Sequence, residues 1–127
     1  MIRKLFTEIT EEISLDKIKD ILGLALKAGF LVKGQDSVKR ELRKGSRLLI
    51  LLTSDHSRNV ASLLEGYRRR GRCRVIVLDF LTRAHVEEVF SMGRTQILGL
   101  PLENGLTSRI EMLVTKGVAA HEQDQDI

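Results

Sequence analysis

The stretch "LLILLT", from Leu48 to Thr53, is a continuous apolar run between polar residues. A strand that is covered on both faces gives this pattern, because neither of its sides meets water. A buried helix segment gives a similar run, so periodicity alone leaves both possibilities open. The runs "RVIVLDF" (residues 74–80) and "TQILGL" (residues 95–100) repeat the pattern further along the chain. Together they predict three buried strands.

Around these runs, apolar residues recur at three- and four-residue steps, the spacing of one face of an amphipathic helix. Ser and Asp mark the helix starts and glycine the ends. The predicted helices run from Ser14 to Gly29, from Asp36 to Lys44, from "SDHS" (residues 54–57) to Gly71, from Thr82 to Phe90 and from Asn104 to Lys116. The predicted inward-facing residues of the first and third are Ile18, Ile21, Leu22, Ala25, Val60, Leu63, Leu64 and Tyr67. Alternating strands and helices predict an α/β protein with helices on both faces of a small sheet.

The two ends of the chain differ from this central pattern. Residues 1–14 predict an N-terminal amphipathic helical extension, because their apolar residues have helical spacing: Ile2, Leu5, Phe6, Ile9 and Ile13. One α/β domain is expected over residues 15–116, a size at which a chain buries most of its apolar surface. The tail "GVAAHEQDQDI", residues 117–127, is polar and acidic, so we expect it to be disordered.

The composition argues against several classes of protein. Hydrophobic residues make up 43% and charged residues 30% of the chain, and no apolar run reaches the roughly 18 residues of a membrane span. The start "MIRKLFTEITEEIS" has acidic residues where a signal peptide has its apolar core, so a cytoplasmic protein is expected. A single cysteine, Cys73, excludes a disulfide framework within the chain and a multi-cysteine zinc site.

No motif with catalytic spacing is found. The glycines match neither a dinucleotide fingerprint nor a P-loop, so no nucleotide cofactor is expected. Ser54, Asp55 and His56 are the residue types of a hydrolytic triad, but sequence neighbours do not line up as nucleophile, base and orienter. A turn and capping role is expected for them. His85 and His121 lack further ligands at metal-binding spacing. We therefore expect no enzyme, no metal site and no cofactor.

Positive charge is concentrated in two places, on a chain of net charge +4 and pI near 9.5. At roughly 100° per residue, the helix that starts at Asp36 turns an apolar face inward with Val38 and Leu42. Its opposite face carries a cationic stripe made of Lys39, Arg40 and Arg43. The glycine ahead of it, Gly34, allows close approach to backbone NH groups that attract phosphate.

The second cluster is "YRRRGRCR", residues 67–74, with five arginines and no acidic residue. Arginine binds phosphate through two parallel hydrogen bonds and stacks on bases, so two clusters favour RNA or DNA over a membrane surface. Two structural roles for these cations stay open: a solvated helix face, and attraction to the negative end of a helix dipole.

Four sequence blocks together point to a known family. They are "ILGLALKAGFLVKGQDSVKRELRKGSRLLILLTSD" (residues 21–55), "VIVLDF" (75–80), "GRTQILGL" (93–100) and "NGLTSRI" (104–110). From about Leu15 to Val114, the chain resembles the kink-turn RNA-binding family of ribosomal proteins L-seven-Ae and L-thirty-e. Among its members, the small bacterial YlxQ-type proteins are the most similar.

This resemblance implies a three-layer α/β/α sandwich with a small mixed β-sheet. It also implies an RNA partner, ribosomal or another stable RNA, met by a glycine-led helix at tandem sheared G·A pairs. The family pattern Gly-x-Asn-Glu-x-x-Lys keeps its glycine at Gly34 and a cation at Arg40. Asp36 stands at the asparagine place and Ser37 at the glutamate place.

The leading hypothesis is a non-catalytic RNA-binding protein that docks a structured RNA through a glycine-led basic helix and an adjacent apolar loop. The helix side of the expected site comprises Lys33, Gly34, Gln35, Asp36, Lys39, Arg40 and Arg43. Ser54 and Asp55 are expected at its rim. The loop that follows the second predicted strand supplies an apolar wall from Leu78, Asp79 and Phe80, where Phe80 either stacks on a base or folds into the core.

Two rival hypotheses remain. In the first, the protein is an interaction or assembly module, because the apolar face of residues Ile2 to Ile13 must be covered by a partner or by a second copy. The oligomeric state is open. The second rival, an RNA-modifying accessory domain, ranks below because no acid, base or cofactor site is found.

Overall fold

The computed structural model describes residues 7–9, 12–78, 81–90 and 93–113. A C-terminal helix covers residues 105–113. Before it come, in chain order, β1 (Thr7–Ile9), α1 (Glu12–Ala28), β2 (Val32–Lys33), α2 (Gln35–Arg43), β3 (Leu48–Thr53), α3 (Arg58–Arg69), β4 (Cys73–Leu78), α4 (Arg83–Phe90) and β5 (Ile97–Pro101). The three strands predicted from apolar runs are β3, β4 and β5, which confirms them.

The strands form one mixed sheet of five strands in the order β1-β4-β3-β5-β2. β1, β4 and β3 are parallel to one another, whereas β5 is antiparallel to both β3 and β2. β3 lies in the centre and all six of its residues are buried. Both of its faces are covered, which explains why its sequence is apolar throughout instead of alternating.

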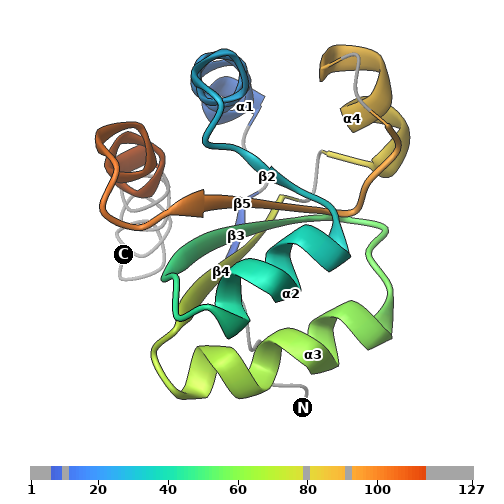
Figure 1. Ribbon diagram of the computed structural model, residues 1–127. Coiled ribbons are helices and arrows are strands. Elements are labelled where there is room, and N and C mark those ends of the chain that lie inside the picture. Colours follow the sequence, from blue (N-terminus) through green and yellow to red (C-terminus); the bar gives the residue numbers. More distant parts are fainter. Residues whose placement is uncertain (1–6, 10–11, 79–80, 91–92, 114–127) are drawn as a thin grey trace, which may run out of the picture.

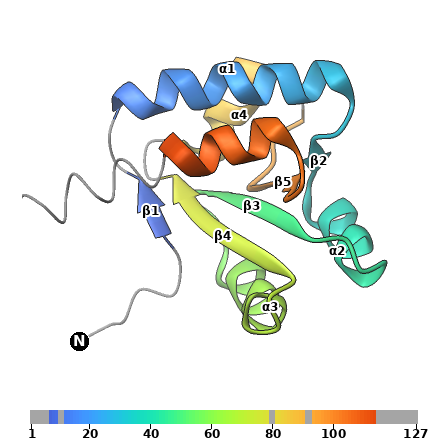
Figure 2. The same ribbon diagram turned by 90° about the vertical axis from the view of Figure 1, so that its left-hand side faces the viewer.

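Helices cover both faces of the sheet (Figures 1 and 2). α1, α4 and the C-terminal helix pack on one face against Leu49 and Leu51 of β3, because side chains alternate between the faces of a strand. α2 and α3 pack on the other face against the remaining apolar residues of β3, Leu48, Ile50 and Leu52. The expectation of a three-layer α/β/α sandwich with a small mixed sheet is confirmed.

The helix faces agree closely with the apolar spacing. Ile18, Ile21, Leu22 and Ala25 of α1 are buried, as are Val38 and Leu42 of α2. On α3, Val60 and Leu64 are buried, while Leu63 and Tyr67 are only half-buried. Gly29, Gly45 and Gly71, which follow the ends of α1, α2 and α3, all have positive φ. These glycines end their helices because a left-handed residue closes the last turn.

The N-terminal segment requires a correction. A helix was predicted across Ile2 to Ile13, but Thr7–Ile9 is a strand that pairs in parallel with Ile76–Leu78 of β4. Pairing with an otherwise open sheet edge overrides the local helical spacing, and the β-branched Thr7 and Ile9 suit a strand. α1 also begins at Glu12, so Ser14 lies inside the helix and does not cap it.

Other parts of the predicted ends fall outside the described residues. These are residues 1–6 and 10–11 of the N-terminal extension, and the whole predicted tail, 117–127. Within the described part of the chain, no helix is long and apolar enough to cross a membrane.

Candidate nucleic-acid interface

The N-terminus of α2 is set up by Gly34. Its φ of 85° and ψ of 160° lie in a region that is essentially restricted to glycine. The Gly34 amide donates to the Ile97 carbonyl oxygen at 3.1 Å, and the Gly34 carbonyl accepts from the Val38 amide at 3.1 Å. No described side chain caps the helix. The first turn of α2 is therefore anchored to β5 through the backbone, and its amides lack a side-chain acceptor.

The outer side of α2 carries the predicted cationic stripe. Arg40 and Arg43 are exposed and Lys39 is half-buried, on the side opposite to the buried Val38 and Leu42. A shallow depression of about 510 Å³ is lined by Asp36, Lys39, Arg40, Arg43 and Lys44. One helix thus brings the predicted basic residues together. Lys33 is exposed in the neighbouring strand β2.

A second depression, of about 320 Å³, adjoins the start of α2. It is lined by Gly34, Gln35, Arg83, Arg94, Thr95 and Gln96. The last four residues were not predicted, because only the sheet order brings the start of α4 and the loop before β5 beside α2. The sequence did hold one signal, the polar "RTQ" directly ahead of an apolar strand. Two further arginines therefore flank the uncapped helix start.

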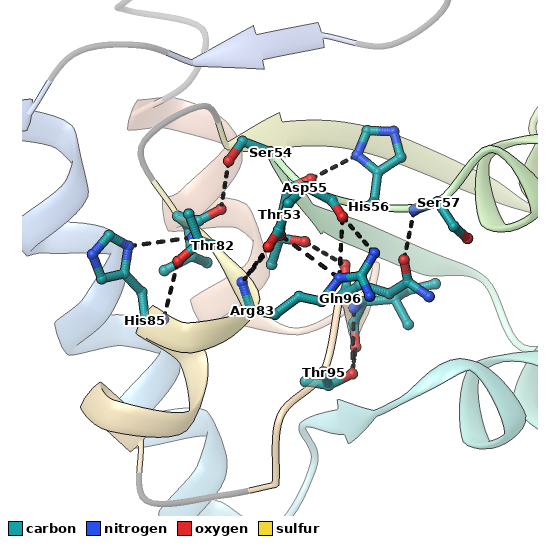
Figure 3. A network of polar contacts seen from close by, with 12 residues as sticks. Thr53, Ser54, Asp55, His56, Ser57, Thr82, Arg83, His85, Thr95 and Gln96 are labelled. Carbon is teal, nitrogen blue, oxygen red and sulfur yellow. Dashed lines mark hydrogen bonds and ion pairs between the residues drawn. The ribbon is translucent and has the colours of Figure 1, made fainter.

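The loop before β5 is held by a hydrogen-bond network (Figure 3). The Gln96 carbonyl accepts from the Thr53 amide at 3.0 Å, and its side-chain Oε1 accepts from the Ser57 amide at 2.6 Å. Thr95 Oγ1 donates to the Ile97 carbonyl at 3.2 Å. Ser57 in turn caps α3, accepting from the Val60 amide at 3.3 Å. These bonds fix the loop against the turn between β3 and α3.

Arg83 is held by Asp55 in the same network (Figure 3). The Arg83 amide donates to Asp55 Oδ1 at 3.1 Å, and the guanidinium Nε donates to the Asp55 carbonyl at 3.1 Å. Partial burial acts to raise the pKa of the Asp55 carboxyl. Hydrogen bonds from Thr53 and from the Arg83 amide outweigh it and hold that pKa below its ordinary value. Asp55 therefore positions the start of α4 and one cation of the rim.

The predicted turn role of "SDHS" is confirmed. Ser54 Oγ donates to the Leu81 carbonyl at 3.3 Å, and His56 Nδ1 lies 2.6 Å from the Thr53 carbonyl oxygen. Ser54, Asp55 and His56 thus each have partners outside the trio. Ser54 and Asp55 link the β3–α3 turn to the start of α4, through the Leu81 carbonyl and the Arg83 amide. Their place at the rim of an RNA site stays a prediction.

The predicted apolar wall requires a second correction. Leu78 is fully buried in the core beneath α1 and α4, so it cannot face a ligand. The reason is that β4 extends through Leu78, and strand alternation turns this side chain inward. Asp79 and Phe80, the other two residues of the wall, lie outside the described residues.

Cys73 is not an activated thiol. Its burial raises the pKa of the thiol to about 11, and the nearby Arg68 only partly opposes this effect. Among the described residues, no group of three or more His, Cys, Asp or Glu could hold a metal ion.

Comparison with known proteins gives matches in fold but not in sequence. No protein-family model matches the chain, and no curated protein matches it. A protein of unknown function from Bacillus halodurans matches with a TM-score of 0.64 and 20% identity, over 78% of this chain and 97% of that one. The Giardia lamblia 15.5kD RNA binding protein matches with a TM-score of 0.63 and 14% identity, over 91% of this chain and 93% of that one. The chain therefore shares its fold with an RNA-binding protein.

Proposed function

We propose that this protein is a non-catalytic RNA-binding protein that docks a structured RNA at the N-terminal end of α2. The observation that carries the proposal is convergence: the uncapped, glycine-led helix start is surrounded by cations from three separate segments. These are the stripe on α2, Arg83 at the start of α4 and Arg94 before β5. Backbone amides at a helix start and arginine side chains are the groups that bind phosphate.

Two features support the docking of RNA at this site. Asp55 holds Arg83 and Gln96 holds the loop before β5, so fewer groups lose freedom when a ligand docks. The shared fold with the Giardia lamblia RNA binding protein supports the same class of ligand. Gln35, half-buried at the first position of α2, is placed to add a polar contact.

The resemblance to the kink-turn family narrows the kind of RNA. We infer a helical RNA with tandem sheared G·A pairs, in ribosomal or another stable RNA, as the resemblance to the RNA-binding members of that family implies. Asp36 lacks the side-chain amide donor of the asparagine whose place it takes, and the Ser37 side chain is shorter than the glutamate whose place it takes. We therefore expect the base contacts to differ from the family pattern, while the cation at Arg40 is kept and Lys39 beside it adds a phosphate contact.

The test is an RNA titration across a salt series with the variant K39A/R40A. The logarithm of affinity falls with the logarithm of salt concentration by roughly 0.7 to 0.9 for each phosphate contact. Loss of two contacts should make this slope shallower by roughly 1.4 to 1.8. The matched control is K17A/R109A, which removes two exposed cations from helices on the opposite layer.

Two hairpin RNAs serve as probes, one with tandem sheared G·A pairs and one with Watson–Crick pairs in their place. Tighter binding of the first would support recognition of the kink-turn type. Equal affinity for the two hairpins would mean that the protein recognises the shape and charge of RNA and not the G·A pairs. If K39A/R40A binds both hairpins as tightly as the wild type, the proposed site is wrong.

One observation favours a second candidate, an assembly role for the N-terminal segment. β1 ends the strand order, so one of its edges has no partner among the described strands. Such an edge can accept a strand from another chain. Deletion of residues 1–11 with a measurement of molecular mass would test this role. Loss of an oligomer with RNA affinity intact would support it, whereas a monomeric wild-type protein would rule out self-assembly.

A further inference from the structure

We propose a second RNA-contacting surface at the opposite end of α2, which engages RNA that extends beyond the first site. It rests on the function proposed above. This distal arginine surface consists of Arg43, Lys44, Arg47, Arg69, Arg70 and Arg72, all of which are exposed. It joins the C-terminal ends of α2 and α3 to the starts of β3 and β4.

Backbone contacts bring the two segments together. Gly45, just past α2, has a φ of 98°, and a Cβ atom placed on it would lie 3.4 Å from Arg72 Nη1. The Leu48 amide donates to the Arg72 carbonyl at 3.2 Å, at the point where β3 and β4 begin to pair. Arg47 and Arg72 thus immediately precede the paired residues Leu48 and Cys73.

Positive charge is concentrated in the two segments that carry this surface and the stripe on α2. Residues 39–47 and 65–74 hold ten Lys and Arg against two Glu, a net charge of +8. The whole chain has a net charge of +4, so all other residues together contribute −4. Like charges brought together on a surface repel one another, and a polyanion relieves that repulsion.

Internal ion pairs account for only part of this charge. Glu41 pairs with Lys44 at 3.3 Å, and Glu65 pairs with Arg68 at 2.6 Å and Arg69 at 3.0 Å. Arg70 lies over the Tyr67 ring, 5.4 Å from its centroid. Within the described part of the chain, Arg43, Arg47 and Arg72 make no ion pair with a carboxylate, so their guanidinium groups are available to a ligand.

The helix dipole does not explain these arginines. Cations in the last turn of a helix are stabilised by its negative end, which accounts for Arg43 and Arg69. Arg47 and Arg72 lie beyond the helices, directly before β3 and β4, and the dipole effect fades within the last turn. Replacement of these two residues therefore tests for an RNA-binding role, because the helix dipole gives them no structural one.

RNA fits this surface better than a membrane does. Membrane-surface helices insert large apolar side chains beside their cations. Among the described residues, the exposed large hydrophobic side chains are Leu24 and Met112, on α1 and the C-terminal helix of the opposite layer. The stripe on α2 connects the two ends over about 14 Å, since nine residues rise by 1.5 Å each. An RNA stem that begins at Gly34 and follows α2 would reach the distal arginine surface.

The experiment uses one hairpin RNA with a short stem and the same hairpin with an extended stem. R47A/R72A should lower affinity for the extended hairpin roughly tenfold and make its salt slope shallower by roughly 1.4 to 1.8. It should leave binding of the short hairpin nearly unchanged. R47K/R72K should keep most of the salt slope. K17A/R109A again controls for net charge, and thermal unfolding of each variant checks that it is folded.

Each outcome decides the matter. If R47A/R72A has the same affinity as the control for both hairpins while K39A/R40A loses affinity, the proposal of a distal RNA surface is wrong and the proposed function stands. If the wild-type protein binds neither hairpin, both proposals fail. Binding to phosphatidylserine vesicles that is lost in R47A/R72A, with RNA affinity unchanged, would assign the surface to a membrane and overturn the RNA role.

Discussion

The two ends of α2 carry similar charge but are held in different ways. At the N-terminal end, hydrogen bonds join Gly34, Gln96 and Arg83 to neighbouring elements. At the other end, Arg47 and Arg72 lack carboxylate partners among the described residues. Under the proposed function, the ordered end is suited to distinguish RNA shapes, because its groups are fixed in space. The distal end is suited only to add affinity, because charge without fixed geometry carries no sequence information.

Substitution of Gly34, at the N-terminal end of α2, should cause the largest loss of stability and of RNA affinity. Gly34→Ala puts a Cβ into a backbone region that costs about 1–3 kcal/mol, although the nearest atom, Thr95 Oγ1, is 4.0 Å away. We expect a loss of that size in the free energy of unfolding in urea, and weaker binding of the short hairpin. Gly45→Ala, also at positive φ, should lose stability yet keep its affinity for the short hairpin. Equal affinities of the two variants for the short hairpin would contradict the proposed difference between the two ends of α2.

Removal of the Gln96 side chain should have the next largest effect. Gln96→Ala leaves the Ser57 amide without its acceptor, which costs about 1 kcal/mol, the low end for an unsatisfied donor, because this amide is only part-buried. Chemical denaturation should report this loss, and RNA affinity should fall because the loop is released. The matched control is Gln35→Ala: it should weaken RNA binding but leave stability nearly unchanged, since the Gln35 side chain forms no hydrogen bond with the described residues. A fully stable Gln96→Ala variant would show that the network does not hold the loop.

Asp55 should make a smaller, pH-dependent contribution. Its folded-state pKa lies below the ordinary 3.8, so the stabilisation is present above about pH 4 and is lost as the pH falls through the folded-state pKa. Asp55→Asn should lower the free energy of unfolding at pH 7 by under about 1 kcal/mol, because the carboxylate is partly exposed. The difference from wild type should shrink in acid. A constant difference from pH 7 to pH 3 would contradict this assignment.

The smallest change in stability is expected at the distal end. Arg69 is exposed, and Arg68 keeps the contact with Glu65 when Arg69 is replaced. Arg69→Ala should therefore change the free energy of unfolding by no more than about 0.5 kcal/mol. Affinity for the extended hairpin should fall measurably all the same. A large loss of stability would mean that the arginines serve the fold and not a ligand.

Much of the fold was predictable because its signals are local. The apolar run of β3 and the spacing of Val38 and Leu42 each report burial within a few residues. The misplaced elements depend on distant partners. Thr7–Ile9 became a strand because β4 offered an edge, and Leu78 turned inward because β4 continues through it.

The candidate site divides in the same way. Gly34, Lys39, Arg40 and Arg43 follow from one helix and its glycine, and all were predicted. Arg83, Arg94 and Gln96 join them only through the strand order, since β5 lies between β3 and β2. No spacing rule within a single segment reports which loops meet at the end of a sheet.

The segregation of charge also bears on how the protein would meet its ligand. Residues 39–47 and 65–74 carry a net charge of +8, twice that of the whole chain, so the positive field is concentrated around α2 and α3. In the field of a polyanion such a molecule rotates before contact, with its arginine-rich end leading. Orientation during diffusion removes unproductive collisions, an effect that salt screens over a Debye length of about 8 Å at physiological ionic strength. The arrangement of α2 and α3 would thus set the speed of encounter as well as the strength of the complex.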